Sequence, residues 1–171
     1  MHGSTDLMHT PIMGTTYVIG RRQRHSHTRP ITDDSGTLRF EVQDSGKASS
    51  VKLSIRDTEG TEVAAISHEI LASHYELLAD GQRITMRACG LLGRHLEINS
   101  AADRLEVVGN YRSRQPFSIT RGGMPTAAVT LRKQFAVEVT DGEDPVLMLG
   151  VALTIASVKA DRAKAMAAAG G

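Results

Sequence analysis

The segment Val146-Leu147-Met148-Leu149-Gly150-Val151-Ala152-Leu153-Thr154-Ile155-Ala156-Ser157-Val158 decides the fold of this chain. Asp144 is a good helix N-cap, and Pro145 suits the first helical position. Apolar groups surround nearly the whole circumference of this predicted helix, so the rest of the protein must enclose it. Its large aliphatic and Met side chains contribute on the order of 10 to 20 kcal/mol if fully buried, an upper figure before entropy. At about 1.5 Å per residue the segment reaches roughly 20 Å, short of a bilayer core of roughly 30 Å, which favours a buried helix over a membrane span.

Upstream of this segment, from about Tyr17 to Val139, apolar and polar residues alternate with the period of β-strands. The clearest runs are residues 38–42, 51–56 and 135–139. Turn-forming groups such as Asp33-Asp34-Ser35-Gly36 and Asp57-Thr58-Glu59-Gly60 separate the runs. Short strands at this regular spacing predict a barrel or a sandwich, and the apolar helix at the end favours a sheet closed around that helix.

The stretch from Ile66 to Leu78 matches a helical template about as well as an alternating one. Its apolar residues stand among Ala and Glu, which are good helix formers. We predict two strands here.

Length and composition indicate one domain of a cytoplasmic protein. The chain has 171 residues, and we expect a single domain over residues 16–164 with flexible tails at 1–15 and 165–171. The N-terminal residues have no apolar run of signal-peptide length, and one Cys excludes an internal disulfide framework and a multi-cysteine zinc site. The charge balance, 20 Lys and Arg against 19 Asp and Glu, removes the global electrostatic case for nucleic-acid binding.

Four stretches of the sequence together resemble a known family. They are residues 31–36 with 53–64, residues 106–111 with 117–119, residues 127–133, and residues 144–158. In this order, over roughly residues 16 to 160, they resemble the bacterial branch of the LURP-one-related family, which is similar to the tubby C-terminal domain and the phospholipid scramblases. The resemblance implies a mainly β fold: a closed antiparallel β-barrel of about twelve strands around a buried hydrophobic C-terminal α-helix. The chain departs from the family pattern at Ser157-Val158-Lys159 and in an N-terminal strand rich in Arg and His.

That N-terminal strand contains the most concentrated positive charge in the chain. The candidate residues for binding an anionic ligand are Arg21, Arg22, Arg24, His25, His27 and Arg29. In the related tubby domain a basic surface holds phosphoinositide headgroups, although no headgroup contact can be transferred residue by residue. The alternative is a solvated edge strand whose Arg side chains discourage pairing with other chains.

Histidine spacing raises the question of a metal site. His25 and His27 are two positions apart, hence on one side of a strand, and could share a metal with His68, His74 or His95. A carboxylate or third His at recognisable spacing is missing, and the scramblase calcium-binding segment has no counterpart. We therefore expect no metal and no cofactor.

These features favour a non-enzymatic binding or scaffold domain over an enzyme. We expect it to engage an anionic membrane surface, a phospholipid headgroup or a protein partner through the basic strand, with peripheral attachment to the membrane. The alternative is an enzyme or small-molecule-binding protein with a pocket at the barrel rim. The sequence has no catalytic triad or carboxylate pair that we recognise, and a helix inside the barrel leaves no interior cavity of the lipocalin kind.

Overall fold

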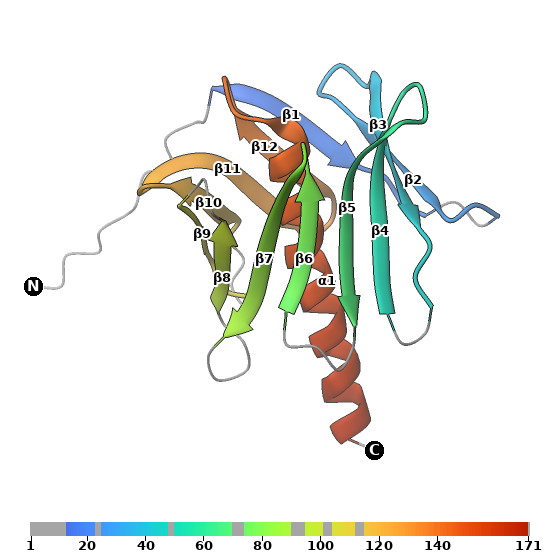
Figure 1. Cartoon of the computed structure of the whole chain (residues 1–171), viewed down its shortest axis with the longest axis vertical. Coiled ribbons are helices and arrows are strands. Elements are labelled where there is room, and N and C mark those ends of the chain that lie inside the picture. The colour runs from blue at the N-terminus through green and yellow to red at the C-terminus, as the bar shows by residue number, and fades with distance from the viewer. Residues whose placement is uncertain are drawn as a thin grey trace, which may run out of the picture.

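The computed structural model describes residues 13–22, 25–47, 50–69, 74–89, 95–100, 104–111 and 115–170. Within these residues, twelve strands are followed by one helix (Figure 1). The elements are β1 (Gly14–Ile19), β2 (Thr28–Thr32), β3 (Leu38–Asp44), β4 (Ser50–Asp57), β5 (Glu62–Glu69), β6 (His74–Ala79), β7 (Gln82–Cys89), β8 (His95–Ser100), β9 (Leu105–Val108), β10 (Phe117–Arg121), β11 (Met124–Leu131), β12 (Phe135–Thr140) and α1 (Pro145–Ala169).

The strands form a closed antiparallel barrel in which each strand pairs with its neighbours in sequence. The barrel closes where β1 pairs with β12, in a register that runs from Gly14 opposite Thr140 to Ile19 opposite Phe135. On its other side, Ile19 pairs with Ile31 of β2. The predicted mainly β class and twelve-stranded closed barrel are confirmed.

Strand alternation and turn chemistry act as the sequence indicates. In β4, Leu53 and Ile55 are buried in the barrel while Lys52 and Arg56 are exposed. Gly60 ends the following turn with a φ of 84°, a conformation that side chains with a Cβ disfavour. A tight reversal of this kind joins β4 to its neighbour β5, as the up-and-down order of the barrel requires.

The stretch that also matched a helical template forms β5 and β6, as predicted. Ile66 and Leu77 lie opposite each other in the ladder between these strands, and both are fully buried. Between them, residues 70–73 lie outside the described part of the chain. The alternating pattern prevails because Ile66 and Leu77 reach the barrel interior from strands, whereas Leu78, the next residue along β6, is exposed.

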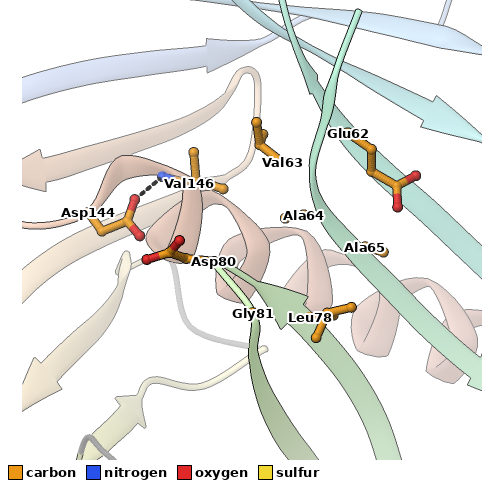
Figure 2. Close-up of a pocket in the computed structure, with 9 residues that line it drawn as sticks. All are labelled: Glu62, Val63, Ala64, Ala65, Leu78, Asp80, Gly81, Asp144 and Val146. Atoms are coloured by element: carbon orange, nitrogen blue, oxygen red, sulfur yellow. Dashed lines mark hydrogen bonds between the residues drawn. The ribbon is translucent and has the colours of Figure 1, made fainter.

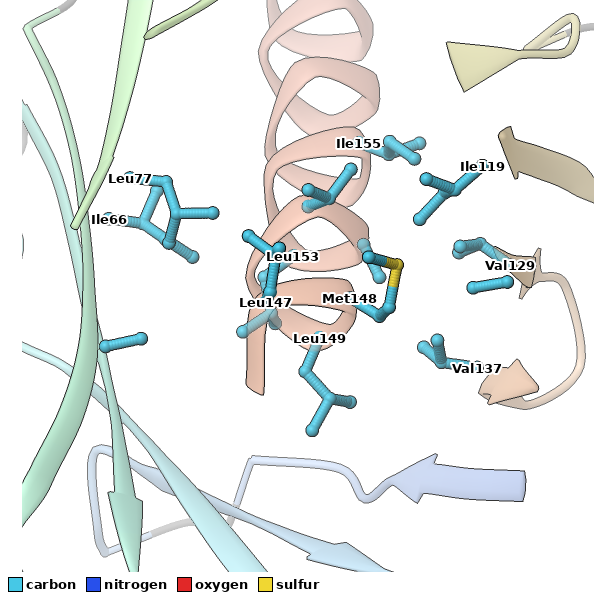
Figure 3. Packing of buried hydrophobic residues seen from close by; sticks show 14 of the residues in the cluster. Ile66, Leu77, Ile119, Val129, Val137, Leu147, Met148, Leu149, Leu153 and Ile155 are labelled. Atoms are coloured by element: carbon cyan, nitrogen blue, oxygen red, sulfur yellow. The ribbon is translucent and has the colours of Figure 1, made fainter. Parts of the chain in front are cut away.

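Helix α1 fills the barrel interior, where its side chains meet those of strands on opposite walls (Figure 3). The Asp144 carboxylate accepts a hydrogen bond from the Val146 N–H at 2.9 Å, and Pro145 occupies the first turn. The buried residues of α1 are Leu147, Met148, Leu149, Gly150, Val151, Ala152, Leu153, Thr154, Ile155 and Val158. An eight-stranded barrel is just filled by side chains, so this wider twelve-stranded barrel needs the helix to complete its core.

The helix continues beyond the apolar segment to Ala169, and its C-terminal turns extend beyond the ends of the neighbouring strands in Figure 1. Close approach of α1 to the wall depends on Gly150, where a Cβ would lie 2.7 Å from Cδ1 of Leu77. No helix in the described part of the chain is both long and apolar enough to cross a membrane.

Candidate anionic-ligand site

The basic residues predicted from the sequence lie where the barrel closes. Arg21 and Arg22 follow the end of β1, and Arg29 lies within β2. The Gly20 N–H donates to the Pro30 carbonyl at 2.8 Å, which holds the segment after β1 beside β2. Because Ile19 pairs with both Ile31 and Phe135, this corner also adjoins the start of β12.

The interpretation of this cluster as one strand is wrong. Arg21, Arg22, His25 and His27 belong to the connection between β1 and β2, so only Arg29 has the strand geometry that the sequence suggested. Arg24 lies outside the described residues. The edge-strand interpretation also fails, because β1 and β2 each pair on both sides in a closed barrel.

A cavity of about 640 Å³ lies at this corner of the barrel. Three of the predicted residues, Arg21, Arg22 and Arg29, line it. Two further cations, Arg132 and Lys133, come from the turn between β11 and β12. The complete lining is Val18, Ile19, Gly20, Arg21, Arg22, Arg29, Asp44, Arg132, Lys133, Gln134 and Phe135.

Sequence reasoning missed Arg132 and Lys133 as site residues. The adjacent basic pair in a turn before an alternating run was visible, but nothing local connects it with residues near the N-terminus. The pairing of Ile19 with Phe135 makes that connection, since it brings the segment after β1 next to the segment before β12.

The cavity is strongly electropositive, because its lining combines five cationic side chains with a single carboxylate, that of Asp44. Nη1 of Arg22 lies 3.8 Å from Oδ2 of Asp44. Burial lowers the pKa of the Arg29 guanidinium below its ordinary value, while the Asp44 carboxylate raises it and Arg22 lowers it further. Arg29 nevertheless stays charged, since a guanidinium is not deprotonated in proteins. An anion entering the cavity would offset the repulsion among these cations.

Of the predicted histidines, His27 contacts a cavity residue. Nη2 of Arg22 donates a hydrogen bond to Nδ1 of His27. His25 is exposed, and neither histidine lines the cavity. The backbone N–H of Asp44 donates to the His27 carbonyl at 2.8 Å, so β3 holds Asp44 beside the segment that carries His27.

The cavity also has an apolar part, formed by Val18, Ile19 and Phe135. Ile19 is buried and belongs to the barrel core, and Phe135 is partly buried against that core. Packing against the core holds these side chains in place, so they form a fixed apolar side of the cavity. A cavity with basic donors beside an apolar surface can bind a ligand that has both an anionic group and an apolar portion.

A second cavity, of about 560 Å³, lies at the barrel rim where α1 begins (Figure 2). Its charged lining residues are Glu62, Asp80 and Asp144, and its apolar ones include Val63 and Val146. Asp144 is already engaged as the cap of α1. The lining of this cavity carries no cation, so its electrostatics oppose an anionic ligand.

A partly buried polar cluster lies beside α1 farther along the helix, at Asp161 and Arg162. The Tyr75 hydroxyl donates to Oδ2 of Asp161 at 2.6 Å, and the His68 ring stacks on Tyr75 with 3.9 Å between centroids. The Arg162 guanidinium lies 4.4 Å from the centre of the Tyr111 ring. These contacts fasten the helix to the barrel wall.

Burial accounts for the titration behaviour of both tyrosines in this cluster. It raises the pKa of Tyr75 above its ordinary value, and the hydrogen bond to the Asp161 carboxylate raises it further. Burial also raises the pKa of Tyr111 to about 12, partly offset by the charge of Arg162.

No group of three His, Cys, Asp or Glu side chains within the described ranges is arranged to hold a metal ion. His68, one of the candidate partners of His25 and His27, instead has its Nδ1 at 3.6 Å from Oδ2 of Asp161.

Comparison with known proteins places the chain by family and fold. Among solved structures, an X-ray structure of a protein from Arabidopsis thaliana is similar, with a TM-score of 0.63 and 17% sequence identity over 84% of this chain and 90% of the other. At that identity the likeness concerns the fold alone. No functionally curated protein matches the sequence. The family model described as LURP-one-related matches residues 15–156, nearly the whole barrel and most of its buried helix. This chain therefore belongs to the LURP-one-related family.

Proposed function

We propose that this protein is a non-enzymatic binding module that recognises anionic phospholipid headgroups at a membrane surface through the basic cavity. The observation that supports the proposal is the cavity lining, in which three separate segments contribute five cations around a single carboxylate. Convergence from three segments distinguishes this site from a solvated run of charge along one strand.

The side-chain chemistry suits phosphate groups. Four of the five cations are Arg, whose planar guanidinium can donate two parallel hydrogen bonds to one phosphate. Basic residues close to an anionic membrane contribute about 1 kcal/mol each, so several together give reversible attachment. The proposed location is accordingly the cytoplasm, with peripheral association at membranes.

Vesicle binding tests this function. The full chain is mixed with vesicles of phosphatidylcholine alone or with phosphatidylglycerol, and the bound fraction is measured by flotation at low and high salt. We expect binding to the vesicles that contain phosphatidylglycerol, weakened by salt because surface charges are screened. Equal binding to neutral and anionic vesicles would contradict the proposal, and binding to neither would point to a protein partner instead.

A charge-matched pair of variants separates the cavity from overall charge. Arg132→Ala with Lys133→Ala removes two cations from the cavity, whereas Arg56→Ala with Arg83→Ala removes two exposed cations that do not line it. At about 1 kcal/mol for each cation, the cavity variant should bind roughly 30-fold more weakly, and the control should bind nearly as wild type does. Equal losses in the two variants would show that only net charge matters.

The alternative function, small-molecule binding at the barrel rim, stays a prediction. The cavity in Figure 2 is its natural location, since it lies between β5, the turn after β6 and the start of α1. Its carboxylates would favour a cationic ligand with an apolar part. Binding of such a ligand should be unaffected by Arg132→Ala with Lys133→Ala.

A further inference from the structure

Arg22 is restrained at the edge of the basic cavity by two partners. Its Nη2 donates to Nδ1 of His27, and its Nη1 lies 3.8 Å from Oδ2 of Asp44. The hydrogen bond from the Asp44 N–H to the His27 carbonyl keeps both partners together. Nδ1 can accept a hydrogen bond only while it carries no proton.

Protonation of His27 would reverse this arrangement. An imidazolium has a hydrogen on both nitrogens, so Nδ1 no longer accepts from Arg22. The new positive charge repels the Arg22 guanidinium and attracts the Asp44 carboxylate. Arg22 thereby loses His27 as an acceptor and competes with the imidazolium for the Asp44 carboxylate. The N–H donors of Arg22 become available to a ligand in the cavity.

We infer that His27 is a protonation switch for the basic cavity, so that mild acid strengthens binding of an anionic membrane surface. This inference rests on the proposed function and adds its regulation. Histidine is the side chain that ordinarily changes charge between pH 5 and 8, which is the range that the experiment below spans. The anionic surface in turn favours the protonated state of His27, because coupling between two binding events is reciprocal.

The groups around His27 have opposing effects on its protonation. The segment of His27 itself carries His25 and Arg29, and the connection after β1 carries Arg22. Strand β3 ends at Asp44. Lys47 follows β3, and Lys52 lies in β4. The backbone of Lys52 accepts from the Ser45 N–H at 2.9 Å, which places β4 beside the end of β3. Asp44 favours the protonated imidazole and the cations oppose it. An anionic membrane shifts that balance toward protonation.

The experiment compares vesicle binding at pH 7.5 and pH 5.5 at constant ionic strength. Vesicles of phosphatidylcholine with phosphatidylglycerol are used, because the charge of a phosphodiester does not change between these values. We expect the wild-type chain to bind at least about fivefold more tightly at pH 5.5, the effect of one added charge near the surface.

The exposed position of His27 permits clean variants. His27→Gln retains an acceptor for Arg22 but cannot be protonated, so it should bind at both pH values as wild type does at pH 7.5. His25→Gln, a neighbouring exposed histidine, should retain the pH response. If His27→Gln still bound the vesicles more tightly at pH 5.5 to the same extent as the wild-type chain, the proposed switch would be overturned.

Failure of the switch is distinguishable from failure of the proposed function. Wild-type binding of equal strength at both pH values would overturn the switch and leave the membrane function standing. Absence of wild-type binding at both pH values would overturn both.

Discussion

At the scale of single residues, Tyr75 shows how one hydroxyl can hold the central helix. Its ring is buried in the barrel core and stacks against His68, while its hydroxyl reaches the carboxylate of Asp161 on α1 at 2.6 Å. A hydrogen bond to a charged acceptor is worth more than one between neutral groups. This contact therefore links the wall and the helix at a point where the apolar segment has already ended.

Removal of that hydroxyl tests the link. We expect Tyr75→Phe to lower the free energy of unfolding at pH 7 by about 1 to 2 kcal/mol, because the Asp161 carboxylate loses its donor. Urea titrations followed by circular dichroism measure the change. A variant as stable as wild type would mean that the hydrogen bond contributes nothing net.

The raised pKa of Tyr75 predicts that the free energy of unfolding changes with pH in the alkaline range. Unfolded tyrosines lose their protons near pH 10, but burial raises the pKa of Tyr75 and of Tyr111, the latter to about 12. Above pH 10 the folded state then holds more protons than the unfolded state. The contribution of these two tyrosines to the free energy of unfolding is therefore fully present below pH 10 and is lost as the pH rises toward 12. Tyr75→Phe should show a shallower loss over this interval, measured by urea titrations at each pH. An identical slope in both proteins would contradict the assignment.

At the scale of elements, α1 depends on its start as well as on its apolar surface. The Asp144 carboxylate caps the first turn through the Val146 N–H, and Pro145 has no N–H that needs a partner. The cap thus satisfies a backbone donor that has no acceptor within the helix itself.

Loss of the cap should weaken the whole domain. We expect Asp144→Ala to cost about 1 kcal/mol of unfolding free energy, and Asp144→Asn to restore most of it because its side-chain oxygen also accepts. Asp141→Ala removes an exposed carboxylate nearby and serves as the control. Thermal unfolding measures all three variants, and equal losses at Asp141 and Asp144 would argue against a capping role.

At the scale of the whole molecule, the barrel and the helix are one core. Side chains from β5, β6, β10, β11 and β12 meet those of α1 inside the barrel, as Figure 3 shows. Net stabilities of domains are only about 5 to 15 kcal/mol, so losing the burial provided by the helix exceeds what the barrel can sustain.

Truncation checks this dependence. A chain that ends at Asp144 should show no cooperative unfolding transition, whereas one that ends at Lys164 should unfold nearly as the full chain does, since residues 165–170 are exposed. Urea titrations followed by circular dichroism distinguish the two. A cooperative transition in the shorter chain would show that the barrel folds without its helix.

The sequence by itself determined the features that are encoded in consecutive residues. Alternation predicted β4 and β12, the Asp and Gly of residues 57–60 predicted a tight turn, and the continuous apolar run after Asp144 predicted an enclosed helix. Each of these signals acts within a few residues, where backbone geometry and burial can be inferred from the pattern alone.

Only the tertiary structure decided which distant residues meet. Arg132 and Lys133 join Arg21 and Arg22 because β1 closes the barrel against β12, and Asp161 reaches Tyr75 because the helix lies inside that barrel. The run of Arg and His was predicted as one strand, yet Arg21, Arg22, His25 and His27 precede β2 and Arg29 lies within it. Such contacts depend on strand register across the whole chain, which no local pattern specifies, and the basic cavity is a product of that register.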